Sequence, residues 1–285
     1  MNGWQHLPET IDPIAGTIGF FSVHWYAVWF LIGFFVMFFF ALHLTQRGVV
    51  AYPRDAVFDM LAVLFFGALI GGRIGYVLLY HPDVFLENPI MIFSPYDFGR
   101  GVWTGLSGMS YYGGLIGVTV ALVWFSARKK LSFWKMADFA ALLAPVAIFF
   151  GRLGNFFNVE LPGRITAVPW GMVFPGTLPR GVLRHPSTLY EAFFEGVVLL
   201  GILLFLRRQA RFDGALACFF LALYAGVRFG SEYFREPDPQ LGLFFNPPTG
   251  GFTLGQILSF AMLCITVVIF VWLKRKNRVK IVHNA

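Results

Sequence analysis

Charged residues are scarce in this sequence. Only 13% of its 285 residues are Asp, Glu, Lys or Arg, whereas soluble globular proteins average about 25%. Hydrophobic residues make up 57% of the chain, and several apolar runs are long enough to cross a bilayer, which takes about 20 residues. The composition excludes an ordinary soluble globule and predicts an integral membrane protein.

Cysteine is rare, and the common catalytic motifs are missing. The two cysteines, Cys218 and Cys264, lie in separate apolar runs, so we exclude a disulfide framework and a CxxC metal site and interpret both as packing residues. The sequence contains no HExxH, GxSxG or Walker loop and no paired-carboxylate spacing. We therefore expect neither a metal nor a cofactor.

The apolar runs predict an all-α membrane protein with seven transmembrane helices. Their expected ranges are about 18–43, 58–80, 109–127, 134–157, 187–206, 214–235 and 252–273. We expect residues 1–285 to form a single membrane domain.

Basic residues are distributed unequally between the two sides of the predicted helices. One side carries fourteen: Arg47, Arg54, Arg128, Lys129, Lys130, Lys135, Arg207, Arg208, Arg211, Lys274, Arg275, Lys276, Arg278 and Lys280. The other carries four: Arg100, Arg164, Arg180 and Arg184. Because cytoplasmic loops are enriched in Lys and Arg, the C-terminus is predicted inside and the N-terminus outside. The net charge of +7 thus reflects topology, and nucleic acid is excluded as a partner.

Two long segments on the outer side, about 81–108 and 158–186, are rich in Pro, Gly and aromatic residues. Loops of this length in a compact protein usually carry function. We expect them to form an outer cap over a site.

Four arginines lie in or at the ends of the apolar runs rather than in the basic loops: Arg73, Arg152, Arg228 and Arg235. Arg152 lies seventeen residues beyond Lys135, or about 25 Å at the helical rise of about 1.5 Å per residue. Arg228 lies equally far beyond Arg211. In a hydrocarbon core about 30 Å thick, the arginines share a layer in the outer half of the bilayer.

A charged group at this depth is costly unless it is paired or hydrated, which makes each arginine a candidate for function. The i, i+4, i+7 spacing of Arg228, Glu232 and Arg235 predicts one helix face, on which Glu232 holds Arg228. The alternative interpretation is salt bridges alone, between Arg228 and Glu232 and between Arg73 or Arg152 and a glutamate of the fifth helix, Glu191 or Glu195.

We expect the arginines to outnumber the acids in this layer and to bind a lipid phosphate, which Arg grips through two donors. Arg73 is included among these phosphate contacts. Tyr26 and Tyr112 fall at a similar depth. His24 and Trp25 precede Tyr26 at the predicted outer end of the first helix, where aromatic residues often anchor a protein at the interface.

Six sequence blocks together resemble the bacterial prolipoprotein diacylglyceryl transferases. In chain order they are "HWYAVWF", "GGRIGYVLLY", "MSYYGGLIG", "GRLGNFFNVELPGR", "RHPSTLYEAFFEG" and "YAGVRFGSEYFREPD". The resemblance covers nearly the whole chain. It implies a seven-helix enzyme of the bacterial inner membrane, with its active site toward the periplasm.

The resemblance also implies a reaction. Such an enzyme moves the diacylglyceryl group of phosphatidylglycerol to the lipobox cysteine thiol of a preprolipoprotein and releases glycerol phosphate, in the first step of lipoprotein maturation. Its partners are then phosphatidylglycerol, the lipobox segment and the lipid bilayer. No cofactor is implied.

Several residues acquire a role through the resemblance. Arg152 is the expected phosphatidylglycerol contact, with Asn155 and Gly163 in the same signature. Arg228, supported by Glu232, is the second essential cation. Tyr26 matches an important tyrosine of the family.

One position differs from the family in a way that affects the chemistry. The family commonly has a histidine, proposed as the base, where this chain has Tyr112. A phenol is a poor base at neutral pH because its pKa is about 10. The base is left open among His24, Tyr112 and no residue at all.

Two other functions remain alternatives at this stage. A catalytically silent relative would bind or present phospholipid without transfer. An anion or lipid transporter would need polar groups at cytoplasmic depth as well, for which Asp138 is the main candidate.

Overall fold

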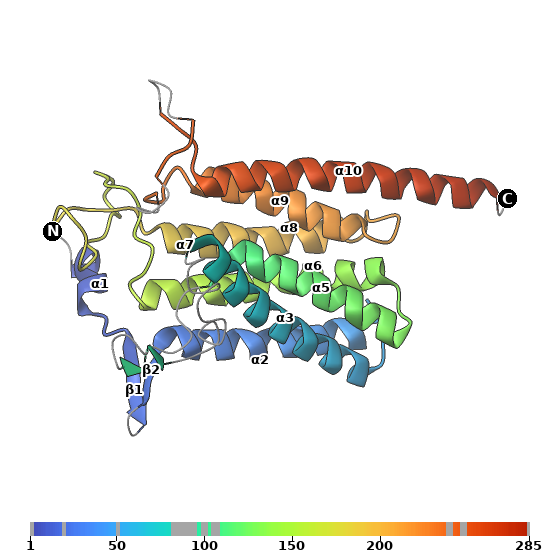
Figure 1. Cartoon of the computed structure of the whole chain (residues 1–285), viewed down its shortest axis with the longest axis horizontal. Helices are drawn as coiled ribbons and strands as arrows, with labels where there is room; N and C mark the ends of the chain where they lie inside the picture. The colour runs from blue at the N-terminus through green and yellow to red at the C-terminus, as the bar shows by residue number, and fades with distance from the viewer. Residues whose placement is uncertain are drawn as a thin grey trace. The chain divides into compact units, whose positions relative to one another are not determined.

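The computed structural model describes residues 3–18, 21–49, 52–80, 96–97, 102–103, 109–237, 242–245 and 250–283. It is mostly helical, as predicted, and adds two short antiparallel strand pairs to the helices (Figure 1). The chain divides into two compact units, one of Met1–Phe40 with Ala137–Ala285 and one of Ala41–Met136. Most of the outer segment expected at 81–108 lies outside the described residues.

Five helices in the described ranges are long and apolar enough to cross a membrane. They are Trp25–Gln46, Arg54–Leu78, Phe133–Phe157, Ser187–Leu206 and Leu254–Arg278. A shorter apolar helix covers Ala215–Ser231, and its length of about 25 Å falls short of the hydrocarbon thickness. These helices agree with a multi-pass membrane protein.

The first long helix begins later than predicted. Helix α2 covers Trp25–Gln46, because the residues before it form a hairpin of β1 (Ile14–Ile18) and β2 (Phe21–His24). The strands pair antiparallel with Ile14 opposite His24, and their β-branched residues favour extended backbone. The prediction that His24 lies in the first helix is therefore wrong, since it ends a strand.

The larger unit contains the second half of the chain. The elements of this half are most of α6 (Phe133–Phe157), α7 (Ser187–Glu191), the π-helix η3 (Ala192–Val198), α8 (Leu199–Leu206), α9 (Ala215–Ser231) and α10 (Leu254–His283). α7, η3 and α8 continue one another, and α10 runs alongside α9 (Figure 1). α10 extends well beyond its predicted end at about residue 273, so the basic tail continues the helix.

Asp138 fixes the start of α9 from a neighbouring helix. Its carboxylate accepts hydrogen bonds from the backbone N–H groups of Gly214, at 2.7 Å, and Ala217, at 2.8 Å. These are among the donors that a helix leaves unpaired in its first turn. Asp138 on α6 thus has a structural use, which weakens its candidacy for a transport path.

Residues 158–186, the segment predicted to form an outer cap, have few regular elements. Arg184, only 4% exposed, donates to the carbonyl oxygens of Gly163 at 3.0 Å and Leu178 at 2.6 Å. The N-terminal elements η1 (Gly3–His6) and α1 (Leu7–Thr10) precede the hairpin, and Gln5 donates to the carbonyl oxygen of Pro169 at 3.1 Å. Hydrogen bonds from the side chains of Arg184 and Gln5 to backbone carbonyl oxygens therefore help to hold this segment in place.

The smaller unit is built on close contact between α3 (Arg54–Tyr80) and α5 (Tyr111–Lys129). Gly71 and Gly75 of α3 face Gly113 of α5 with no room for side chains, since a Cβ at Gly75 would lie 2.6 Å from the Cα of Gly113. Small residues permit this approach between helices in membranes. The short pair β3 (Tyr96–Asp97) and β4 (Val102–Trp103) completes the described elements.

Candidate functional site: a buried arginine and glutamate cluster

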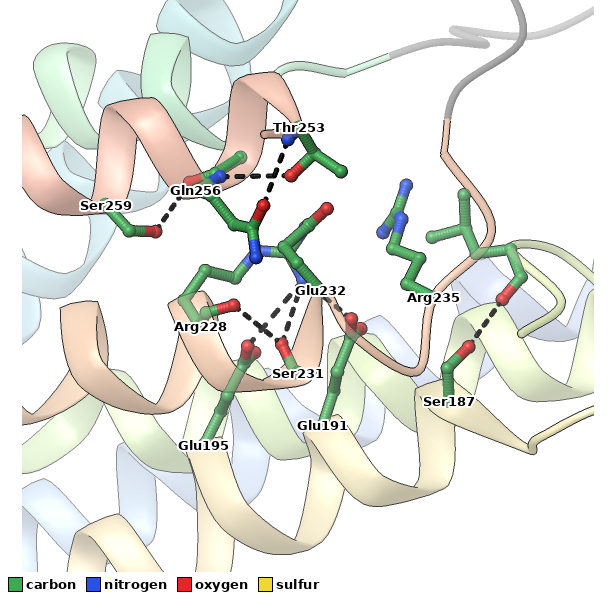
Figure 2. Close-up of polar contacts among 12 residues, drawn as sticks. Ser187, Glu191, Glu195, Arg228, Ser231, Glu232, Arg235, Thr253, Gln256 and Ser259 are labelled. Carbon is green, nitrogen blue, oxygen red and sulfur yellow. Dashed lines mark hydrogen bonds and ion pairs between the residues drawn. The ribbon is translucent and has the colours of Figure 1, made fainter. Parts of the chain in front are cut away.

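Two of the predicted arginines meet on one carboxylate in the larger unit. Arg152 lies on α6 and Arg228 on α9, and both reach Glu191 at the end of α7. Arg152 Nη1 lies 2.9 Å from Glu191 Oε2, and Arg228 Nη1 donates to Glu191 Oε1 at 2.6 Å. Figure 2 shows the approach of Arg228 to Glu191. A single carboxylate thus bridges two guanidinium groups from different helices.

Glu195 and Glu232 complete the cluster. Arg152 contacts Glu195 Oε2 through both Nε and Nη2, each at 3.0 Å. Arg228 pairs through Nη2 with Glu232, four residues further along the chain. Two-donor contacts such as that of Arg152 with Glu195 fix the plane of a guanidinium group as well as its position. The predicted ion pair between Arg228 and Glu232 is confirmed.

The π-helix η3 contains one of the two central carboxylates. Glu191 directly precedes η3 and Glu195 lies inside it, about one turn apart, so both face the arginines. Gly196 brings this turn close to α6, because a Cβ there would lie 2.6 Å from the Cβ of Phe149. π-helical turns occur often at functional sites, and this one lies against α6, the helix that carries Arg152.

The cluster is buried almost completely. Glu191 is 1% exposed and Glu195 is 0% exposed, while the side chains of Arg152 and Arg228 are 13% and 11% exposed. An unpaired charge at such a site costs several kcal/mol. These four groups can therefore remain ionised at this buried site only because they pair with one another.

The count of charges corrects one prediction. We expected the arginines to outnumber the acids, but in this cluster two guanidinium groups pair with three carboxylates. The salt bridges offered as the alternative, Arg228 with Glu232 and Arg152 with the glutamates of the fifth helix, do form. The sequence did not show that Glu191 and Glu195 turn toward the same two arginines.

Arg235 does not share the helix face of Arg228, contrary to prediction. α9 ends at Ser231, and Arg235 instead forms an isolated β-bridge with Gly163. The helix ends early because the chain turns at 232–234 toward the cap.

A second set of polar side chains lies near the C-terminal end of α6. Asn155 and Asn158 donate from Nδ2 to the two carboxylate oxygens of Glu160, at 3.0 and 2.8 Å. Tyr26 packs on the same helix, with its ring 3.0 Å from the position of a Cβ at Gly154. The larger unit thus brings together Tyr26, Arg152 and the amides that hold Glu160.

Gly163 has a role in packing. A Cβ there would collide with the carbonyl oxygen of His185 and lie 2.6 Å from that of Phe234, so only glycine fits between these backbone segments. His185 Nδ1 lies 3.2 Å from the hydroxyl of Tyr190, and partial burial lowers the pKa of His185 by disfavouring the imidazolium form. Gly163 therefore links the cap to the segment that follows α9.

The remaining predicted residues are Arg73, Tyr112 and His24. Arg73 on α3 and Tyr112 on α5 belong to the smaller unit, and the guanidinium of Arg73 lies 5.9 Å from the ring centre of Tyr76. His24 is an exposed residue at the end of β2. Within the described ranges, no group of three His, Cys, Asp or Glu is arranged to hold a metal ion.

Sequence reasoning missed Glu160 as the partner of both asparagines. The signal was present in "GRLGNFFNVELPGR", where Glu160 follows Asn158 by two residues. It also treated Glu191 and Glu195 only as possible partners in separate pairs. Their spacing of four residues after "RHPS" could have indicated one shared acidic face.

Comparison with known proteins agrees with the resemblance seen in the sequence blocks. Residues 13–272 match the family described as prolipoprotein diacylglyceryl transferase. A protein of Photobacterium profundum is 44% identical over 265 residues, which are 92% of this chain and 93% of the relative. Proteins of Chlorobaculum tepidum (41% over 275 residues, 96% and 93% of the two chains) and Vibrio vulnificus (45% over 278 residues, 96% and 96%) are similar as well.

All three relatives are named phosphatidylglycerol–prolipoprotein diacylglyceryl transferase. The helical fold, the apolar helices and these matches define a membrane-bound transferase. The chain belongs to the prolipoprotein diacylglyceryl transferase family.

Proposed function

We propose that this protein transfers the diacylglyceryl group of phosphatidylglycerol to the lipobox cysteine thiol of preprolipoproteins and releases glycerol phosphate. The observation that carries the proposal is the meeting of Arg152 and Arg228 on shared glutamates in a chain 41–45% identical to transferases of that name. Two fixed guanidinium groups suit a substrate whose leaving group is a phosphate.

The glutamates hold the guanidinium groups in place for the phosphate. Each guanidinium carries five N–H donors, more than its glutamate contacts occupy, and about a tenth of each arginine side chain remains exposed. We assign the phosphate to the guanidinium N–H donors that the glutamate contacts leave over. Because the groups are already fixed, little reorganisation is needed when the negative charge develops. The negative charge of the three carboxylates also keeps the affinity of the cluster for an anion moderate before the reaction begins.

In the reaction, the thiol sulfur attacks the glycerol carbon that bears the phosphate ester. A carbon–sulfur bond forms, the carbon–oxygen bond to phosphate breaks, and the electron pair leaves with the phosphate oxygen. Arg152 and Arg228 stabilise this charge, and the same positive groups favour the thiolate form of the attacking cysteine. Asn155 and Tyr26, which lie along α6 and α2 near Arg152, are assigned to the headgroup.

The thiol proton leaves to a base or to water. His24 and Tyr112 are the two candidate bases, and a third possibility needs no residue, because the arginines lower the cost of thiolate formation. His24 is exposed at the end of β2 and is therefore accessible to a peptide. Arg73 remains assigned to lipid binding on account of its depth in α3.

The topology proposed here has seven spans in the bacterial inner membrane, with the N-terminus in the periplasm and the C-terminus in the cytoplasm. α5 and α9 are the two helices added to the five of clear membrane length. The excess of basic residues on the C-terminal side supports this orientation. The arginine cluster then faces the periplasmic side, and the lipid approaches laterally from the outer leaflet.

The proposal is tested by transfer in a purified system. Wild-type protein, phosphatidylglycerol and a lipobox peptide should give a thioether product. Arg152→Lys and Arg228→Lys keep the charge but lose the planar fork, and each is expected to lower kcat/KM by about a hundredfold. Arg208→Lys, at an exposed loop position, is the matched control and should match wild type.

Three results would contradict the proposal. Wild-type protein that binds phosphatidylglycerol but gives no product would indicate a catalytically silent relative. Phosphate or lipid flux in proteoliposomes without transfer would indicate a transporter. Normal transfer by both lysine variants would remove the arginines from the mechanism.

A further inference from the structure

The first turn of α10 lies against the carboxylate of Glu232. A Cβ placed on Gly255 would lie 2.5 Å from Glu232 Oε1 and 2.7 Å from its Cδ. Figure 2 shows Glu232 between Arg228 and this turn, which carries Thr253 and Gln256. Glycine at 255 therefore leaves the space that the carboxylate occupies.

A capping box closes the start of α10 at the same place. The backbone N–H of Thr253 donates to Gln256 Oε1 at 3.0 Å, and the backbone N–H of Gln256 donates to Thr253 Oγ1 at 3.1 Å. Ser259 Oγ donates to the carbonyl oxygen of Gly255 at 2.7 Å. Thr253 and Gln256 are both 4% exposed and Ser259 is 0% exposed. The geometry of this turn is thus fixed by buried hydrogen bonds.

The start of α10 also supplies positive charge where the cluster needs it. Two guanidinium groups pair with three carboxylates in the cluster. Glu195 Oε1 also lies 4.0 Å from Arg228 Nη1, so among the described residues Glu232 is the member of the cluster paired with a single arginine, Arg228. A helix N-terminus favours a neighbouring carboxylate because its unpaired N–H groups carry partial positive charge. Glu232, 4% exposed, lies at that end of α10.

We infer that Gly255 and the capped first turn of α10 are positioning elements that hold Glu232, and through it Arg228, in the orientation that binds the lipid phosphate. Glu232 is fixed on one side by Arg228 Nη2 and on the other by the backbone of α10. α10 thereby acts on the site without contacting the substrate. The inference rests on the proposed function, because Arg228 is the residue whose orientation matters.

The substitution Gly255→Ala tests the contact directly. Its methyl group would force Glu232 to move, because real Cβ atoms do not approach other atoms this closely. Alanine forms helix more readily than glycine, so a loss of function would not come from a weaker helix. We expect KM for phosphatidylglycerol to rise about tenfold with a smaller change in kcat.

Two further variants separate positioning from general damage. Gly201→Ala adds the same methyl group inside α8, where nothing lies within 4 Å, and should behave like wild type. In a Glu232→Asp background the shorter side chain leaves room for the methyl group, so Gly255→Ala should then change KM by no more than about twofold. Thr253→Ala removes the capping hydroxyl without adding an atom, and should also raise KM if the turn positions Glu232.

The outcomes distinguish this inference from the proposed function. If wild type and Gly201→Ala give no thioether product, the proposed function fails. If they are active and Gly255→Ala keeps the wild-type KM, only the positioning role is wrong. If Gly255→Ala does not fold, an unchanged KM in Thr253→Ala overturns the role. An equal KM penalty from Gly255→Ala in the wild-type background and in the Glu232→Asp background would likewise contradict it.

Discussion

Glu191 has two arginine partners, and each arginine contacts at least two glutamates. Removing one member therefore leaves its partners buried with uncompensated charge, which typically costs about 3–5 kcal/mol of stability. An alanine variant of this cluster would therefore lose activity both through poorer folding and through a missing contact, and an activity assay would not separate the two causes. Charge-conserving variants such as Arg228→Lys are the informative ones, because they change the geometry of the contact and keep the charge.

The hydroxyl of Tyr112 is the first group to test among the candidate bases. We expect Tyr112→Phe to keep kcat/KM within about tenfold of wild type, because a phenol is a poor proton acceptor at neutral pH. The pH profile of kcat/KM for both proteins is the measurement. A loss of about a thousandfold or more would contradict this expectation and assign a proton transfer to Tyr112.

Spacing in the sequence predicted part of the site at the level of residues. The i, i+4 relation gave the Arg228 and Glu232 pair, because it depends on one helix only. The sharing of Glu191 between Arg152 and Arg228 depends on how three helical segments pack, and no local pattern contains that. Arg235 was misplaced because the chain leaves the helix at Ser231.

At the scale of elements, the glycines between α3 and α5 make a sharp prediction. A methyl group at Gly113 would collide with the carbonyl oxygen of Gly71, whereas one at Gly114 would lie at an ordinary 3.5 Å from the nearest atom. We expect Gly113→Ala to destabilise the protein by about 1–3 kcal/mol and Gly114→Ala to be nearly neutral. Thermal unfolding in detergent compares the two, and equal melting temperatures would contradict the close packing.

The lengths of the apolar runs in the sequence predicted where most helices lie, but not where each helix begins or ends. α6 covers Phe133–Phe157 and α7 to α8 cover Ser187–Leu206, close to the expected 134–157 and 187–206. The start of α2 was wrong because β1 and β2 are also apolar, and composition does not separate a short apolar strand from a helix. The π-helix η3 could not be predicted from the sequence, because its amino-acid composition does not distinguish it from an α-helix.

At the scale of the whole molecule, the proposed orientation predicts which residues face the periplasm. In a background with Cys218 and Cys264 replaced by serine, we expect Glu9→Cys to react with a membrane-impermeant maleimide in intact spheroplasts. Asp213→Cys should react only after the membrane is opened, since it follows the basic loop assigned to the cytoplasm. Labelling of Asp213→Cys in intact spheroplasts would reverse the topology.

Equilibrium binding of phosphatidylglycerol to the purified protein decides whether Arg152 and Arg228 grip the lipid phosphate. The dissociation constant should rise about tenfold or more in Arg152→Lys and in Arg228→Lys, because the two-donor contact is lost, and should be unchanged in Arg208→Lys. Wild-type affinity in both cluster variants, with folding intact, would show that the arginines serve only to neutralise the glutamates.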